Sequence, residues 1–298
     1  MTLADSCEQY QWNPIDSGAS HSQLAGTLAA LVLTVTVVLL STSPRRPNRT
    51  FALIQFLASL FSLTYAAYLF SLIAGLQDCR QAWRLLMVAA DGLGVGVLGI
   101  FGGLSWLVIA RGDVEDAVNR FTTTIGFIVA GFVIIDLSAT AHDFRVRILT
   151  PEEIPDWVGV ALIVHIALAA AAFVAVAVSR RSIRPNGMRS VRAAAVSTLV
   201  CTIVGGLSMD AIMKNTGDGD APSWINVVAL LVAVVPGTVA AIIHLYALPT
   251  RGAREYILGR HSVRQFPLQA KNADSIEKGP GEPKAAGATK SRVPRRNR

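Results

Sequence analysis

The sequence predicts an all-α integral membrane protein, a bundle of seven transmembrane helices with the N-terminus outside and the C-terminus in the cytoplasm. Of its 298 residues, 52% are hydrophobic and 16% are charged, whereas soluble domains are about 45–50% apolar and about 25% charged. The apolar residues form long uninterrupted blocks, and the charged residues gather in the gaps and at the C-terminal end. This distribution excludes a soluble enzyme, a disordered chain and a nucleic-acid-binding domain.

Seven segments are long and apolar enough to cross a membrane, which takes about 20 residues for about 30 Å of hydrocarbon. They are rich in Ala, Leu, Val and Gly and show no strand-like alternation, so helices would satisfy their backbones in lipid. In chain order, the expected spans are Leu24–Leu40, Phe51–Leu76, Leu85–Ala110, Phe121–Thr140, Trp157–Val178, Val191–Met213 and Trp224–Leu248. Polar residues dilute the sixth span more than the others.

The positions of lysine and arginine predict the orientation, because cytoplasmic loops retain positive charge. With seven crossings, 22 of the 27 Lys and Arg residues fall in one set of gaps together with the C-terminal end, and five fall in the other set. We therefore expect a multi-pass protein of the plasma membrane. It would have an extracytoplasmic segment (1–23), the helical bundle (24–248) and a basic cytoplasmic tail (249–298).

The tail carries 12 Lys and Arg against four Asp and Glu, together with Gly, Pro, Ser and Ala. It has no hydrophobic periodicity, a composition typical of disorder, and we expect it to rest on anionic lipid headgroups. Cys7 and Cys79 both fall on the outer side, where a disulfide and two unpaired thiols are equally compatible with the sequence. Cys201 is expected to be a small packing residue.

Ionisable side chains inside the spans are the candidate functional residues, because a charge at membrane depth costs several kcal/mol. A rise of about 1.5 Å per residue puts Asp91 about 10 Å and His165 about 12 Å below the outer surface. Asp136 and Asp210 fall near the outer ends of their spans, so these four converge on the outer half of the bundle. His244 is expected at the cytoplasmic interface. The sequence therefore predicts an outer-leaflet acidic cluster of Asp91, Asp136, His165 and Asp210.

Each of these residues also has a purely structural interpretation. Asp210 and Lys214 are four apart with the acid first, a favourable helix pair. Arg80 or Arg84 could neutralise an outer carboxylate, and His165 could be a hydrogen-bonded packing residue. Asp136 has no basic residue within a helix turn and would need a partner on another helix.

Glycines line one face of the third span at small-residue spacing, at positions 92, 96, 99 and 103. Such spacing lets helix backbones approach closely, so we expect a tightly packed third helix. Gly205-Gly206 and Pro236-Gly237 are expected at kinks or close contacts.

Several membrane-protein classes are disfavoured by residues that the spans lack. No expected span contains a lysine, so a retinal Schiff base cannot form, and no His-x-x-x-His pair suggests the zinc site of a seven-helix hydrolase. We expect no cofactor and no metal.

The first functional hypothesis is a membrane-embedded enzyme that acts on a lipid or isoprenoid substrate by acid–base chemistry, such as cyclisation or isomerisation. Asp91 would be the leading acid, with Asp136, His165 and Asp210 as its catalytic partners. The aromatic substrate-binding candidates, able to face cationic intermediates, are Tyr65, Tyr68, Trp106 and Trp224. Seven-helix integral-membrane terpene cyclases share this topology, although no motif carries over residue by residue.

Two alternatives belong to other classes. In a proton-coupled small-molecule transporter, the same acids would relay protons or bind a cation. In a receptor-like or structural protein, they would be interhelical hydrogen-bond partners, and the basic tail would dock a cytoplasmic partner. The oligomeric state is not predicted.

Overall fold

The structure is a computed structural model that describes residues 13–41, 47–110, 116–149, 155–179, 187–215 and 223–249. Cys7 and the predicted tail beyond Pro249 lie outside these residues. All regular structure in the described part is helical, and seven helices are long and apolar enough to cross a membrane. The elements are α1 (Pro14–Ser41), α2 (Pro47–Ile73), α3 (Cys79–Ala110), α4 (Asp116–Asp143), the π-helical turn η3 (Phe144–Ile148), α5 (Trp157–Ser179), α6 (Gly187–Asn215) and α7 (Ser223–Ala247).

Each predicted span corresponds to one helix, but several helices begin well before their apolar residues. The extra turns come from capping rather than from hydrophobicity. Asn13 Oδ1 accepts the backbone N–H of Ile15 at 2.9 Å, and Pro14 takes the first helical position, where a missing N–H costs nothing. Asp78 Oδ1 accepts the backbone N–H of Arg80 at 2.9 Å in the same way. Consequently α1 begins ten residues, and α3 six residues, before the predicted start.

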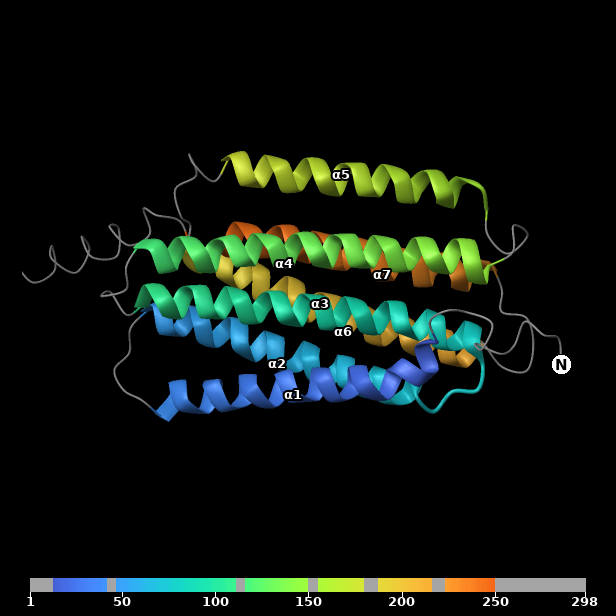
Figure 1. Ribbon diagram of the computed structural model, residues 1–298, viewed down its shortest axis with the longest axis horizontal. Helices are drawn as coiled ribbons and strands as arrows, with labels where there is room; N and C mark the ends of the chain where they lie inside the picture. The colour runs from blue at the N-terminus through green and yellow to red at the C-terminus, as the bar shows by residue number, and fades with distance from the viewer. Residues whose placement is uncertain are drawn as a thin grey trace, which may run out of the picture. The chain divides into compact units, whose positions relative to one another are not determined.

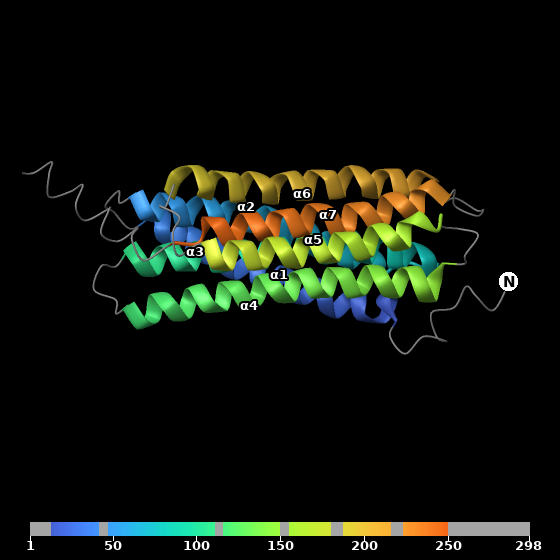
Figure 2. The ribbon, with the colours of Figure 1, turned by 90° about the horizontal axis from the view of Figure 1, so that it is seen from above.

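The helices run side by side along a common direction (Figures 1 and 2). α3 lies in the middle and packs against α1, α2, α4, α6 and α7. α1 and α5 lie at opposite edges in Figure 1. The main contacts of α5 are with α4 and α7, and its buried residues are few: Val158, Gly159, Ala169 and Val176.

The predicted close packing of the third helix is confirmed, and its partner is α2. A Cβ atom on Gly96 would lie 2.8 Å from Leu63 Cγ, and one on Gly103 would lie 2.7 Å from Phe56 Cε1. The Ser62 hydroxyl donates to the Gly92 carbonyl at 2.8 Å. The two backbones therefore approach too closely for larger side chains on this face of α3.

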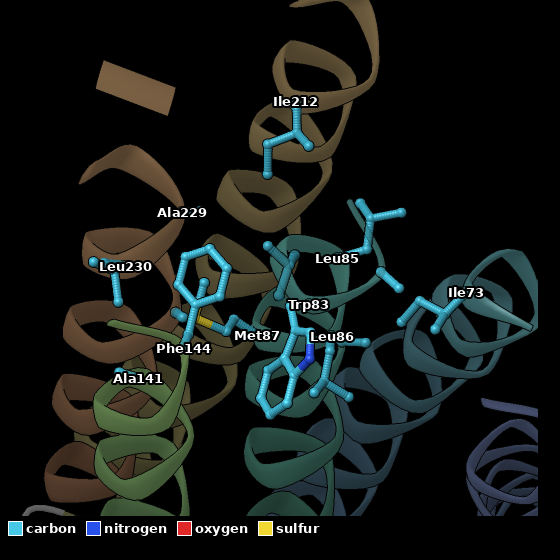
Figure 3. Close-up of a cluster of buried hydrophobic side chains, with 14 of the residues drawn as sticks. Ile73, Trp83, Leu85, Leu86, Met87, Ala141, Phe144, Ile212, Ala229 and Leu230 are labelled. Atoms are coloured by element: carbon cyan, nitrogen blue, oxygen red, sulfur yellow. The ribbon is translucent and has the colours of Figure 1, made fainter. Parts of the chain in front are cut away.

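Large side chains fill the end of the bundle where α3 begins. Figure 3 shows the buried side chains of α3 facing those of α6, α7 and η3. Phe144 of η3 and Leu85 of α3 are fully enclosed. Because lipid is as apolar as these side chains, their close packing rather than the hydrophobic effect holds the helices together here. This packing fixes the height of α3 relative to α6 and α7, and with it the position of Asp91.

Candidate functional site

Asp91 is the acid that the structure places in the interior. Its residue is 3% exposed, and its Oδ1 oxygen has no hydrogen-bond partner among the described residues. It lies about four residues from the midpoint of α3, which is about 6 Å along the helix. A buried carboxyl oxygen without a donor is rare and calls for an explanation.

Four helices surround this carboxyl. Oδ1 occupies the space where a side chain at Gly237 of α7 would begin, and Leu137 of α4 closes on the same point, with its Cδ1 atom 2.7 Å from an added Cβ. The Cys201 thiol at the midpoint of α6 lies within electrostatic range of Asp91. We call Asp91, Leu137, Cys201 and Gly237 the Asp91 site.

The hydrogen-bond ladder of α7 lacks one bond beside this site. Pro236 stands inside α7 and has no N–H, so the carbonyl of Val232, four residues earlier, lacks its usual helical donor. Gly237 follows and is the only residue type that leaves room for the Asp91 carboxyl. The predicted close contact at Pro236-Gly237 is thus the place where the Asp91 carboxyl of α3 packs against the backbone of α7.

His165 reaches the same turn of α7 from another side. Its Nε2 atom is 3.1 Å from the Thr238 hydroxyl, and Thr238 is buried. Consecutive residues of a helix point about 100° apart, so Asp91 and His165 meet adjacent residues of α7 without lying on the same face.

The other two predicted acids face outward. Asp136 is exposed on α4. Asp210 is exposed on α6, where its Oδ2 accepts from Lys214 Nζ at 2.6 Å, and their side chains are 61% and 71% exposed. This ion pair is the structural alternative for Asp210. Of the four predicted catalytic residues, only Asp91 and His165 reach the same turn of α7; whether any of them acts in catalysis stays a prediction.

The four aromatic candidates are dispersed. Tyr65 lies between α2 and α6, with its hydroxyl 3.7 Å from Met209 Sδ. Tyr68 and Trp224 are about half exposed. Trp106 is buried but lies 15 residues beyond Asp91 on α3, about 22 Å along the axis. Its Nε1 donates to the Ala247 carbonyl at 3.0 Å, so its observed contact is with the end of α7.

Arg84 does not bond to Asp91. Its Nε donates to Asn226 Oδ1 of α7 at 2.9 Å, and both residues are buried. Asn226 was not among the sequence candidates; the available signal was an amide side chain near the start of an apolar span. The pair joins α3 to α7 about two turns from Asp91 toward the start of α3.

A second buried polar group lies on the other side of Asp91, toward the end of α7. The His244 ring accepts or donates through Nε2 at 2.9 Å from Thr198 Oγ1 of α6. Gln55 of α2 donates through Nε2 to the Val191 carbonyl at 3.2 Å. His244 lies in the last turn of α7 and is 3% exposed inside the bundle, so its predicted position at the cytoplasmic interface stays a prediction, but its side chain is enclosed by other helices. We call Gln55, Gly102, Thr198 and His244 the His244 site.

The structure answers part of the question whether Cys7 and Cys79 are disulfide-bonded or unpaired. Cys79 is disulfide-bonded, whereas Cys201 is free and buried, as the packing interpretation predicted. Cys7 lies outside the described residues.

Among the described residues, no group of three or more His, Cys, Asp or Glu side chains is placed to hold a metal ion. Comparison with protein-family models, with curated proteins and with solved structures finds no match for this chain.

Proposed function

We propose that this multi-pass membrane protein is a proton-coupled carrier of small solutes and that Asp91 is its proton-binding group. The observation that carries the proposal is a buried carboxyl oxygen without a partner among the described residues, near mid-bundle, beside the proline inside α7. Ionisable residues in this setting mark proton relays and coupling sites in membrane proteins.

The coupling follows from the cost of burying charge. An ionised Asp91 enclosed between α3, α4, α6 and α7, with no counter-ion among the described residues, costs several kcal/mol, whereas the protonated form avoids most of that cost. Proton binding and enclosure therefore favour one another, and ionisation favours an arrangement that admits water. Pro236 and Gly237 provide a place where α7 can change direction without losing a regular helical hydrogen bond.

A second candidate is the membrane-embedded enzyme for lipophilic substrates. It is favoured by one observation, the approach of Asp91 and His165 to consecutive residues of α7. A protonated acid and a base at one depth are the minimum for acid-initiated isomerisation. We place it second because Asp136 and Asp210, which the hypothesis also uses, face outward.

Orientation is part of the proposal. The charge asymmetry favours an extracytoplasmic N-terminus, and the Cys79 disulfide at the start of α3 supports the same assignment, because cytosolic thiols are kept reduced. The proposal also places the protein in the plasma membrane, with its basic tail (249–298) bound to anionic lipid headgroups.

The test compares cells that express the wild-type protein with cells that express Asp91→Asn. Uptake and efflux of a panel of small solutes are measured by mass spectrometry, with and without a protonophore. We expect at least one solute whose flux falls tenfold or more both with the protonophore and with Asp91→Asn. A flux that is indifferent to the protonophore would contradict coupling.

Asp210→Asn is the matched control, since it makes the same chemical change at an exposed ion pair. It should transport like the wild type. The enzyme hypothesis predicts a different result, namely a lipid product in extracts of wild-type cells that is missing with folded Asp91→Asn and Asp136→Asn.

A further inference from the structure

The orientation of the Gln55 amide is fixed by its neighbour. The atom that faces the Val191 carbonyl must be the amide nitrogen, because a carbonyl oxygen only accepts hydrogen bonds. The other end of the amide is therefore the acceptor Oε1. This oxygen is buried and has no hydrogen-bond partner among the described residues.

The protonation of the His244 ring depends on the Thr198 hydroxyl. When this hydroxyl donates to the Ala194 carbonyl at 3.1 Å, Thr198 Oγ1 accepts from His244 Nε2 at 2.9 Å. In the neutral ring, the proton sits on Nε2 and leaves Nδ1 as an acceptor. Nδ1 is also buried without a partner in the described part of the chain.

The two acceptors flank one point. A Cβ atom placed on Gly102 of α3 would lie 3.7 Å from His244 Nδ1 and 3.8 Å from Gln55 Oε1. The missing side chain of Gly102 therefore leaves space beside both atoms. Two buried acceptors that face the same space need a donor with two hydrogens between them.

We propose that the His244 site binds a water molecule that donates to Gln55 Oε1 and to His244 Nδ1, in the space beside Gly102. Water is a small molecule and has the two donor hydrogens that these two acceptors require. It can also accept, so it would bridge the two residues if the ring carried its proton on Nδ1 instead. The site joins α2, α3, α6 and α7 and does not depend on the function of Asp91.

Water-edited solid-state NMR on the full-length protein in bilayers tests the proposal. The experiment measures magnetisation transfer from water protons to the ring of His244, in samples without ammonium. We expect fast transfer to this ring although the residue is 3% exposed. Transfer no faster than that to buried leucines would overturn the proposal.

Gly102→Ala is the decisive variant. Its added methyl would be in ordinary van der Waals contact with both residues, so the fold should tolerate it, but it takes the place of the water. We expect the transfer to fall at least threefold. Gly131→Ala is the control, because its methyl would meet only the Phe173 ring, at 3.8 Å. Equal transfer in Gly102→Ala and the wild type would overturn the proposal.

If Gly102→Ala does not fold, Gln55→Met removes one acceptor at similar length and should lower the transfer as well; unchanged transfer would then count against the site. In a further arm, ¹⁵N-labelled ammonium is added. If a contact to His244 appears only when ammonium is present, the occupant of the site is a cationic donor and not water, and the proposal is overturned. None of these results depends on the solute flux that tests Asp91.

Discussion

Asp91 and Gly237 form a complementary pair at the residue scale. The carboxyl of one helix fits only because the other helix has no side chain at that point. In the described part of the chain, packing holds the acid in place, and no group donates a hydrogen bond to Oδ1. A group held in this way can change its protonation state without first breaking a salt bridge.

Gly237→Ala is predicted to destabilise the protein by about 1–3 kcal/mol, the usual cost of overpacking. The new methyl would overlap Asp91 Oδ1 and lie 2.7 Å from Leu137 Cδ1, so at least one helix must shift. The measurement is the thermal unfolding midpoint in detergent at a fixed scan rate.

The same substitution has an internal check. In an Asp91→Ala background, Gly237→Ala should cost less, because the oxygen that it meets is gone. An equal loss of stability in both backgrounds would show that Asp91 does not fill the space beside Gly237. Gly131→Ala, whose added methyl would make only ordinary van der Waals contact with Phe173, should leave the midpoint unchanged or raise it slightly.

The sequence could identify Asp91 as a candidate but could not tell that it differs from Asp136. Each is the only acid in its expected span, Leu85–Ala110 for Asp91 and Phe121–Thr140 for Asp136. In a soluble helix, the polar face reveals which side is outward, but lipid and bundle core are equally apolar, so this signal is weak in a membrane. The rotation of α3 and α4 about their axes is set by packing, as at the α3 glycines, and that rotation decides which acid is buried.

At the scale of elements, α5 differs from the other helices. It has few buried residues, and its described side-chain hydrogen bond to the bundle joins His165 to Thr238. Hydrogen bonds between membrane helices contribute about 0.6 kcal/mol on average. α5 is thus tied to α7 weakly, and at the level of Gly237.

Thr238→Val is predicted to loosen α5 while it leaves α2 and α3 unchanged. The substitution keeps the shape of the side chain and removes the hydroxyl that bonds to His165. Hydrogen–deuterium exchange followed by mass spectrometry should show faster exchange in α5 peptides.

Thr64→Val provides the comparison for this experiment. The Thr64 hydroxyl donates to the Leu60 carbonyl of its own helix at 2.8 Å and is exposed. Its loss should not change α5. Faster exchange throughout the protein in Thr238→Val would instead indicate general destabilisation.

At this scale, the sequence predicted which segments form helices but not where the helices begin. Hydropathy located all seven spans because apolar length is a direct requirement of the bilayer. It missed the polar turns at the start of α1 and α3, which Asn13 and Asp78 cap. It also missed Gln55 and Thr198, since uncharged polar residues in a span are common enough that only their position in the bundle distinguishes them.

At the scale of the whole molecule, orientation determines which compartment each site faces. We predict that a membrane-impermeant maleimide added to intact cells labels the outer-side cysteines only after reduction has opened the Cys79 disulfide, with the labelled residue located by peptide mass spectrometry. A cysteine appended after Arg298 should be labelled only after permeabilisation. The test uses a Cys201→Ser background, so that the free buried thiol does not contribute.

Labelling of the appended cysteine in intact cells would contradict the proposed orientation. Labelling of Cys79 without reduction would contradict the disulfide, while the orientation would stand. The two assignments are thus tested separately by one experiment.

In the proposed carrier, the loose attachment of α5 has a consequence for how solutes enter. If α5 moved away from α7, the buried turn around Thr238 would open to the bilayer rather than to water. A hydrophobic solute dissolved in the lipid would then reach this turn sideways, between two helices, without crossing the interface twice. Affinity for such a solute would depend on its partitioning into the membrane, so its effective concentration would be set by lipid composition as much as by supply from solution.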